Sequence, residues 1–79
     1  MNSEQISLDS LETGQVCRVV SLENKGALRR RLRDMGIIEG TKIECCLKST
    51  FSDPKAYKVR GTVIALRSRD AGDIKIKII

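Results

Sequence analysis

The sequence predicts a mostly β protein, a small antiparallel β-barrel with one short α-helix between its first two strands. Five short segments alternate apolar and polar residues, which is the period of a half-buried strand. One further segment repeats its apolar residues at helical spacing. Parallel neighbours need crossovers of about a dozen residues or more, and only one connection here approaches that length. An antiparallel arrangement follows.

The strands are predicted over residues 15–22, 41–48, 55–60, 63–67 and 73–79. In the second strand Ile43 and Cys45 alternate with charged residues, and in the third strand Tyr57 and Val59 share one face. The last strand is expected to turn its isoleucines inward and its lysines outward: Ile74, Ile76 and Ile78 against Lys75 and Lys77. Residues 7–11 are expected to form one helical turn, and residues 68–72 a tight turn or a single 3₁₀ turn.

The helix is predicted over residues 27–35. Leu28, Leu32 and Met35 fall at i, i+4 and i+7, so they share one side. A helix this short does not hold itself in water, so these three side chains are expected to pin it to the sheet. Gly36 stands where a C-cap glycine would, and Gly40 begins the turn into the next strand. A helix placed there plugs one end of the barrel, which is an SH3-like arrangement.

The charge of the chain favours an acidic partner. Fifteen Lys and Arg stand against 10 Asp and Glu, a net charge of +5. From Lys25 to Arg33 there are five cations and no acid. No segment approaches the roughly 20 apolar residues of a membrane-spanning helix, and the first residues lack the pattern of a signal peptide. A single soluble domain over residues 1–79 is therefore expected, cytoplasmic and without direct membrane insertion.

The residue inventory argues against catalysis and against a metal centre. The chain has no His to serve as a general base, and no Gly-rich phosphate loop. Its three cysteines are an odd number, and Cys45 and Cys46 point to opposite faces if they lie in a strand. Together with Cys17 they supply too few suitably placed ligands for a tetrahedral metal site, which needs four. No enzyme activity, no cofactor and no metal are expected, and the cysteines are interpreted as small apolar residues.

Ordered motifs run from about residue 7 to residue 78. The two most specific are Arg31-Leu32-x-Asp34-Met35-Gly36-Ile37-x-x-Gly40-Thr41 and Arg60-Gly61-x-x-Ile64-Ala65-Leu66-Arg67. Shorter ones are Ser7-Leu8-x-x-Leu11-x-x-Gly14, Asp53-Pro54 and Ala71-x-x-Ile74. Taken together, the set resembles the FeoA family, small cytosolic accessory proteins of bacterial ferrous iron transport.

The resemblance implies an SH3-like β-barrel and a protein partner. That partner is FeoB, a membrane transporter that carries a cytosolic GTPase domain. The accessory protein would support or regulate transport by contacting the cytosolic parts of the transporter, and would not itself be the permease. The chain departs from the family pattern in two places: Thr50-Phe51-Ser52 stands where a Pro-Leu-Gly run is usual, and Ala27 stands where a Pro is common.

Two groups of residues are singled out as candidates. Those expected to bind the partner are Lys25, Arg29, Arg30, Arg31, Arg33 and Phe51. Arginine suits this role because its planar fork pairs with carboxylates at two points. Arg31 is alternatively expected to lay its stem over the barrel and to bond carbonyls at strand ends. The residues expected to serve the structure are Leu28, Leu32, Met35, Gly36, Gly40 and Leu66.

Other interpretations stay open at this point. A basic small barrel also fits nucleic-acid binding, although nucleic acid is not the expected partner because only Phe51 and Tyr57 are available to stack on bases. SH3-like domains of this kind also occur at the end of iron- and manganese-dependent repressors, but the chain has no helix-turn-helix. The arginines are alternatively a solvated helix face without a partner. The oligomeric state is not predicted.

Overall fold

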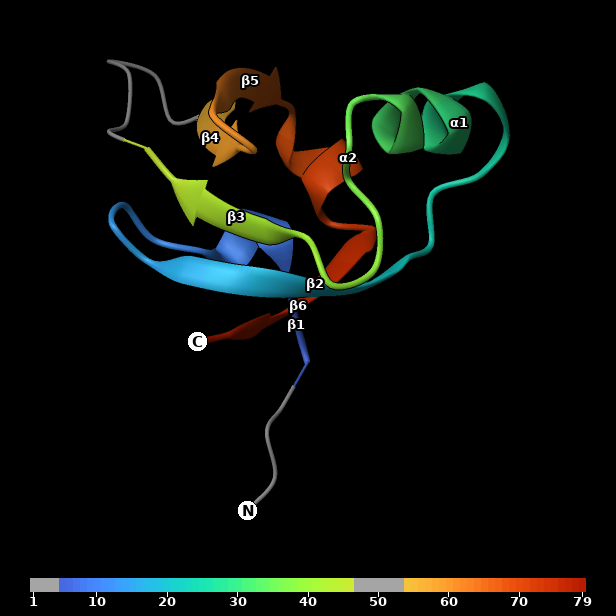
Figure 1. Ribbon diagram of the computed structural model, residues 1–79. Coiled ribbons are helices and arrows are strands. Elements are labelled where there is room, and N and C mark those ends of the chain that lie inside the picture. Colours follow the sequence, from blue (N-terminus) through green and yellow to red (C-terminus); the bar gives the residue numbers. More distant parts are fainter. Residues whose placement is uncertain (1–4, 47–53) are drawn as a thin grey trace.

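The computed structural model describes residues 5–46 and 54–79. Within these ranges strands and short helical segments alternate along the chain (Figure 1). The strands are β1 (Ile6–Ser7), β2 (Val16–Leu22), β3 (Lys42–Cys45), β4 (Lys55–Val59), β5 (Thr62–Leu66) and β6 (Ile74–Ile78). The helical segments are the 3₁₀ turn η1 (Leu8–Ser10), α1 (Gly26–Asp34) and α2 (Ser68–Ala71). None of these helices is long and apolar enough to cross a membrane.

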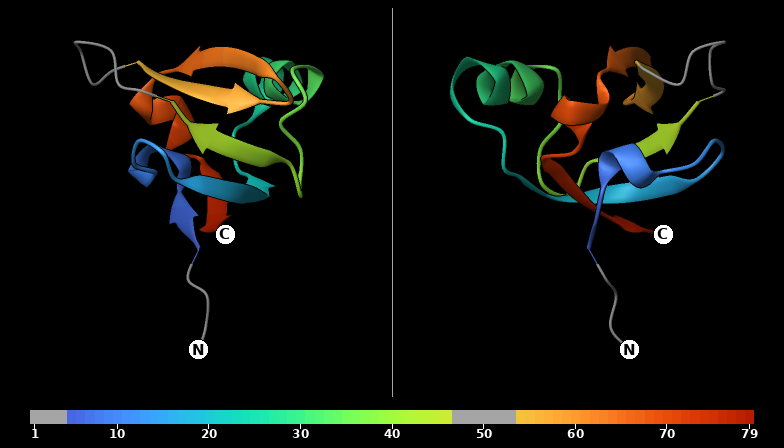
Figure 2. Two further views of the ribbon diagram at one scale, coloured as in Figure 1. Left: turned by 60° about the vertical axis from the view of Figure 1, so that its left-hand side comes forward. Right: turned by 180° about the vertical axis from the view of Figure 1, so that it is seen from behind.

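The six strands form one antiparallel sheet in the order β1-β6-β2-β3-β4-β5. β2 lies inside the sheet, where Cys17 stands opposite Ile43 of β3 and Ile78 of β6. The sheet bends so that β4 and β5 lie above β2 and β6 (Figure 2). Its two edges, β1 and β5, are not paired with each other in the described residues. The helix α1 lies at one end of the bent sheet, away from the C-terminus (Figure 1).

The predicted mostly β architecture is confirmed, as is the place of the helix between β2 and β3. The number of strands is six rather than five. The additional strand is β1, in which Ile6 and Ser7 pair with Ile76 and Lys75. A two-residue strand has no period of its own, so only its partner reveals it. The segment predicted as a tight turn at residues 68–72 contains the single-turn helix α2.

Boundaries differ from the prediction by a few residues. The helix begins at Gly26 and ends at Asp34, one position earlier at each end than predicted. β3 ends at Cys45, and residues 47 and 48, which were predicted to continue it, lie outside the described residues. β5 begins at Thr62, because the turn before it occupies only Arg60 and Gly61.

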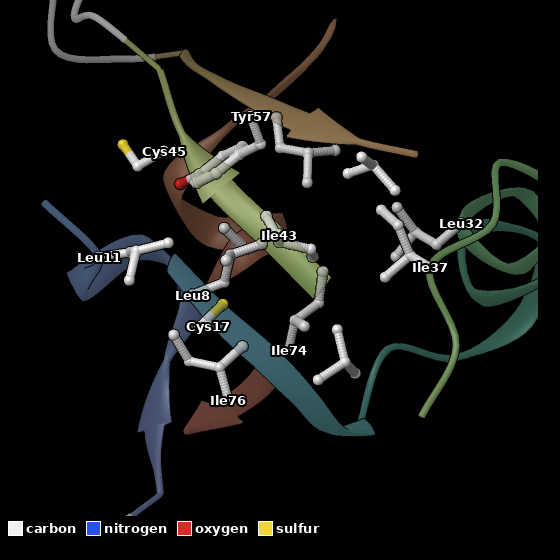
Figure 3. Close-up of a cluster of buried hydrophobic side chains, with 14 residues drawn as sticks. Leu8, Leu11, Cys17, Leu32, Ile37, Ile43, Cys45, Tyr57, Ile74 and Ile76 are labelled. Atoms are coloured by element: carbon white, nitrogen blue, oxygen red, sulfur yellow. The ribbon is translucent and has the colours of Figure 1, made fainter. Parts of the chain in front are cut away.

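One apolar core fills the bend of the sheet (Figure 3). Its fully or nearly fully buried members come from all strands from β2 onward, from η1, α1 and α2, and from the connections: Leu8, Leu11, Cys17, Val19, Leu32, Ile37, Ile43, Cys45, Tyr57, Val59, Leu66, Ala71, Ile74 and Ile76. Ile6, Leu22, Leu28 and Ile64 pack against it while partly exposed. The core is mostly aliphatic, as the near absence of aromatic residues requires.

Two details of the strands correct the expected pattern. Ile74 and Ile76 are buried, but Ile78, expected to point inward as well, is 47% exposed. In β2 the pairing with β6 shifts between Val19 and Ser21, which is a β-bulge. The bulge moves the following side chain to the other face, so Leu22 packs against the core.

Candidate partner-binding surface

The arginine-rich side of α1 faces solvent. The five cations expected to bind a partner there, Lys25, Arg29, Arg30, Arg31 and Arg33, are all exposed. None of them donates a hydrogen bond or forms an ion pair with any residue in the described ranges. We call these five residues the cationic helix face. Because their charges are not neutralised within the described part of the protein, they are available to an acidic partner. Phe51, the sixth candidate, lies outside the described residues.

The opposite side of α1 attaches the helix to the core at its C-terminal end. Leu32 is fully buried beside Ile37 (Figure 3). The backbone N–H of Ile37 donates to the carbonyl of Leu32 at 3.0 Å, and that of Gly36 to the carbonyl of Arg33 at 2.9 Å. This pair of bonds is a Schellman motif, with the apolar contact between its first and last residues that commonly accompanies it.

The third residue of the expected stripe departs from it. Met35 is 36% exposed, whereas Leu28 packs against the core while partly exposed. The helix ends at Asp34, and Met35 is its C-cap, the last residue before the chain leaves the helical path. Gly36 then has φ +97°, which reverses the chain direction and brings Ile37 into the core in place of Met35. The other residues expected to serve the structure include Leu66, which is 7% exposed.

A groove runs beside the cationic helix face. It measures about 410 Å³ and is formed by β2, α1 and the α1–β3 connection: Ser21, Leu22, Arg29, Arg33, Ile38 and Glu39. Arg29 and Arg33 are one helical turn apart, so both stand on the same wall. Leu22 and Ile38, the latter 42% exposed, supply apolar surface. A second hollow of about 420 Å³ lies against Arg29, Arg30 and Arg33 together with Gly26 and Asp34. We call the first hollow the α1–β2 groove.

Arg31 does not make the carbonyl hydrogen bond of its alternative role within the described residues. It is exposed and donates no hydrogen bond to a carbonyl in the described residues. Two other basic residues do bond carbonyls of distant connections. Arg18 Nη1 donates to the carbonyl of Gly40 at 3.0 Å. Lys55 Nζ donates to the carbonyls of Asp9 at 2.6 Å and Leu11 at 3.0 Å, which ties β4 to the η1 region.

The connection after α1 is held in one conformation by its own polar groups. Thr41 Oγ1 donates to the carbonyl of Gly36 at 2.9 Å and accepts from the backbone N–H of Ile38 at 3.1 Å. Gly40 has φ +87°, a conformation that L residues rarely adopt. A Cβ built on Gly36 would lie only 2.9 Å from Cδ of Arg60. The connection therefore presents Ile38 to the α1–β2 groove from a defined backbone.

Two of the three cysteines, Cys17 and Cys45, lie in the core, and Cys46 is partly exposed. Cys17 is fully buried, and this burial raises the pKa of its thiol from 9.0 to about 11. Cys45 Sγ donates a hydrogen bond to the carbonyl of Cys46 at 3.6 Å. Across residues 5–46 and 54–79, no three Cys, Asp or Glu side chains converge as metal ligands do. A thiol held neutral by burial is a poor nucleophile and a poor ligand.

The family of the chain follows from its match to a family model. The FeoA domain model matches residues 6–78. The chain belongs to the FeoA domain family. The FeoA domain is a non-catalytic accessory domain associated with ferrous iron transport, which agrees with the expectation from the residue inventory that the chain is not an enzyme.

A sequence relative connects the family to a transporter. The Fe(2+) transport protein A/Fe(2+) transporter FeoB fusion protein of Porphyromonas gingivalis is 31% identical over 72 residues. The aligned part is 91% of this chain and 8% of the fusion protein. The chain therefore spans a small part of that relative's length, and the activity of the whole fusion protein does not pass to it by similarity.

Solved structures of the same fold include a FeoA-like protein and a FeoA protein. An NMR structure of a FeoA-like protein from Clostridium acetobutylicum has a TM-score of 0.85 and 32% identity, covering 100% of this chain and 91% of that one. The crystal structure of Stenotrophomonas maltophilia FeoA complexed with zinc, described as a prokaryotic SH3 domain protein, has a TM-score of 0.79 and 25% identity. It covers 90% of this chain and 88% of that one. The fold is therefore SH3-like.

Reasoning from the sequence alone missed the apolar half of this surface. Leu22 lies in the strand predicted over residues 15–22, and the bulge that places it in the α1–β2 groove is a tertiary feature. Ile38 follows the helix with no periodic partner, and Arg60 was assigned to a strand although its φ of +52° places it in a turn. The motif Arg60-Gly61 before an apolar run was the one available signal for that turn.

Proposed function

We propose that the chain binds the cytosolic part of a FeoB-type ferrous iron transporter and supports iron uptake through that contact. The P. gingivalis relative carries the two parts in one polypeptide, which holds them at high effective concentration. A chain that belongs to the FeoA family and has no helix in its described residues able to cross a membrane fits the accessory role at the cytoplasmic side.

The observation that carries the docking site is the unneutralised cationic helix face beside the α1–β2 groove. Exposed like charges raise the rate at which an acidic surface is captured, and guanidinium groups then pair with carboxylates at two points. Leu22 and Ile38 offer apolar surface at the same place, so a partner residue that enters the groove is desolvated beside Arg29 and Arg33. Aromatic or aliphatic anchors in such pockets dominate binding energy at interfaces.

Nucleic-acid binding is the weaker alternative. Single-strand binding proteins stack bases on exposed aromatic side chains. Tyr57 is 1% exposed and its ring lies in the core, so it is not available to stack. A positive surface alone would give salt-sensitive binding without sequence preference.

The test is a charge-reversal variant with a matched control. The triple variant Arg29→Glu, Arg30→Glu and Arg33→Glu removes most of the cationic helix face without touching a buried residue. Its affinity for the purified cytosolic part of the transporter, measured by calorimetry, is expected to fall about 10- to 100-fold, because each rim charge contributes about 0.5–1 kcal/mol. The salt dependence of binding is expected to flatten, because steering charges act mainly on the encounter rate.

The control carries the same change of charge elsewhere. Lys42→Glu, Arg69→Glu and Lys77→Glu alter three exposed cations that lie away from α1 and make no hydrogen bond in the described residues. This control is expected to lose much less affinity than the helix variant. An equal loss of affinity in the helix variant and in the control would assign the effect to net charge. Unchanged affinity in both variants would show that the partner docks on another surface. Tighter binding of wild type to nucleic acid than to the transporter part would refute the accessory role.

A further inference from the structure

Within residues 5–46 and 54–79, the outer edge of β5 is an unpaired strand edge without charge. β5 is the last strand in the sheet order, and among the described residues it pairs only with β4. Its five residues, Thr62–Leu66, carry no charge, no proline and no bulge. Val63 is 60% exposed, and Thr62 and Ala65 are exposed as well. Proteins usually protect such an edge with charged residues, proline, bulges or a covering segment.

The backbone groups that point outward from this edge follow from the register. A two-residue turn, Arg60-Gly61, joins β4 to β5, and both of its residues have positive φ (52° and 84°), as a type I′ turn requires. The pair that flanks such a turn, Val59 and Thr62, exchanges hydrogen bonds, and bonded pairs alternate from there. The N–H and C=O groups of Val63 and Ala65 therefore point away from β4.

The neighbouring strand supports this assignment independently. Ala56 stands opposite Ala65 in the β4–β5 ladder. The carbonyl of Ala56 accepts from the backbone N–H of Cys46 at 2.9 Å, so it points toward β3 and not toward β5. The Ala56–Ala65 pair is therefore a pair without mutual hydrogen bonds. In the described residues, no other strand and no turn bond uses the backbone of Val63 or Ala65.

We propose that the β5 edge binds an extended acidic segment of a protein partner, which adds as an antiparallel strand. The four outward groups of Val63 and Ala65 supply the main-chain hydrogen bonds of such an addition. Cations surround the site: Arg60 and Arg67 flank the strand, and Lys58 stands opposite Val63 on the exposed face. This positive surround selects an acidic segment over a neutral or basic one.

The same charges argue against a second copy of this chain as the occupant. Antiparallel pairing of two β5 strands about Ile64 would bring Arg67 of one copy beside Arg60 of the other at both ends. The net charge of +5 on each copy adds a longer-range repulsion. An acidic strand avoids both the repulsion between arginines and the repulsion between two positively charged chains.

The register defines the side-chain pattern of the ligand. Residues opposite Val63 and Ala65 share the exposed face with them, so small or β-branched residues fit there. The next ligand residues on the same face lie opposite Gly61 at one end and Arg67 at the other. A carboxylate at these positions would lie close to Arg60 or Arg67. The expected ligand thus alternates, with an acid at each end of an apolar pair. This surface lies on other elements than the cationic helix face, and the proposal does not depend on docking through α1.

The experiment is a titration of the uniformly ¹⁵N-labelled chain with a synthetic peptide. The probe has about nine residues, with Val at the two central outward positions, Thr between them and Glu at the flanking ones. A peptide with Lys in place of Glu is the charge control. We expect the acidic peptide to shift the amide signals of Val63 and Ala65 most, to slow hydrogen exchange at those two amides, and to bind at least about tenfold more tightly than the Lys peptide.

Variants separate main-chain pairing from a diffuse charge effect. Val63→Pro removes one outward donor and leaves the β4 ladder intact, since the N–H of Val63 does not face β4. It is expected to weaken binding at least about tenfold, whereas Val63→Thr, which keeps both the donor and the β-branched shape, is expected to change it less than about threefold. If Val63→Pro does not fold, Ala65→Glu at the exposed next-but-one position serves instead and is expected to weaken the acidic peptide by a similar factor.

Three results would overturn the proposal. The first is binding that Val63→Pro and Ala65→Glu both leave unchanged. The second is a set of amide shifts centred on Arg29 and Arg33, which would assign the peptide to the cationic helix face. The third is a dimer of the wild-type chain in sedimentation that Val63→Pro abolishes, which would show that the edge pairs with itself. Failure of the transporter-binding experiment with the helix variant leaves this titration unaffected.

Discussion

The β2–β6 pair and the helix α1 are held in the molecule in different ways. β2 and β6 share a ladder through the middle of the sheet, and the pair buries Cys17, Val19, Ile74 and Ile76. In α1 only Leu32 is fully buried, and five exposed cations lie on or next to the helix. The helix is secured mainly at its C-terminal end, through the Schellman motif and Ile37.

The β2–β6 pair and the helix α1 differ in how many of their residues can change without loss of stability. In β2 and β6 nearly every inward residue serves the core, so a partner surface there would compete with stability. On α1 only Leu32 is fully buried and Leu28 packs against the core at its side, so most other positions of the helix can vary without loss of core packing. Exposed charges on such a helix contribute little to folding, so they are available for a partner at small energetic cost.

The largest effect is expected in the sheet. Ile76 is fully buried and its strand pairs with both β1 and β2. Ile76→Ala is expected to lower the free energy of unfolding by about 4 kcal/mol, measured by urea denaturation, because the cavity it leaves lies between three strands. Ile78→Ala, on the same strand but 47% exposed, is expected to cost less than about 1 kcal/mol. If Ile76→Ala does not fold, Ile76→Val, at about 1 kcal/mol, provides the measurement.

A somewhat smaller effect is expected at the anchor of the helix. Leu32→Ala is expected to cost about 3 kcal/mol, since the end of α1 can relax into part of the cavity. Met35→Ala, one turn on and 36% exposed, is expected to cost less than about 1 kcal/mol. Equal costs at the two positions would contradict the ending of the helix at Asp34.

The pH dependence of stability tests the interior of the sheet. The pKa of Cys17 is raised to about 11 in the folded protein by burial, against 9.0 ordinarily. Between these values the unfolded chain has lost the thiol proton while the folded chain keeps it, so stability falls as pH rises from 9 to 11. The loss is about 2–3 kcal/mol in all, at about 1.4 kcal/mol per pH unit. Cys17→Ala should lack this part of the slope, and identical slopes in the two proteins would show that Cys17 ionises normally.

The smallest effect is expected at the glycines that follow α1. Gly36→Ala and Gly40→Ala both force Ala into positive φ, at a cost of about 1 kcal/mol each. Gly36→Ala must also displace the Arg60 side chain, whose Cδ lies 2.9 Å from the new Cβ, whereas nothing lies within 4 Å at Gly40. Thermal unfolding is therefore expected to show the larger loss at Gly36, and Arg60→Ala in the same background is expected to remove the difference.

Local patterns in the sequence were sufficient for the architecture. Alternation in β3, β4 and β6 and the helical spacing of Leu28 and Leu32 are period signals that backbone geometry imposes on any chain. The charge cluster on α1 was visible for the same reason, because a surface charge needs no tertiary partner. The absence of His likewise excluded much of enzyme chemistry directly from the composition.

Only the tertiary structure decided the remainder. The strand β1 is defined by its pairing with β6, which the two residues of β1 do not reveal by themselves. The bulge in β2 is likewise a shift in its pairing with β6, and it places Leu22 against the core. Helical spacing places Met35 on the buried side, but Ile37 is buried in its place. The backbone hydrogen bonds at the end of α1 determine this outcome, and side-chain spacing does not reveal them. The α1–β2 groove and the open edge of β5 are relations between elements distant in the chain. Such relations follow from packing, which the sequence encodes through the whole core at once and not through any one segment.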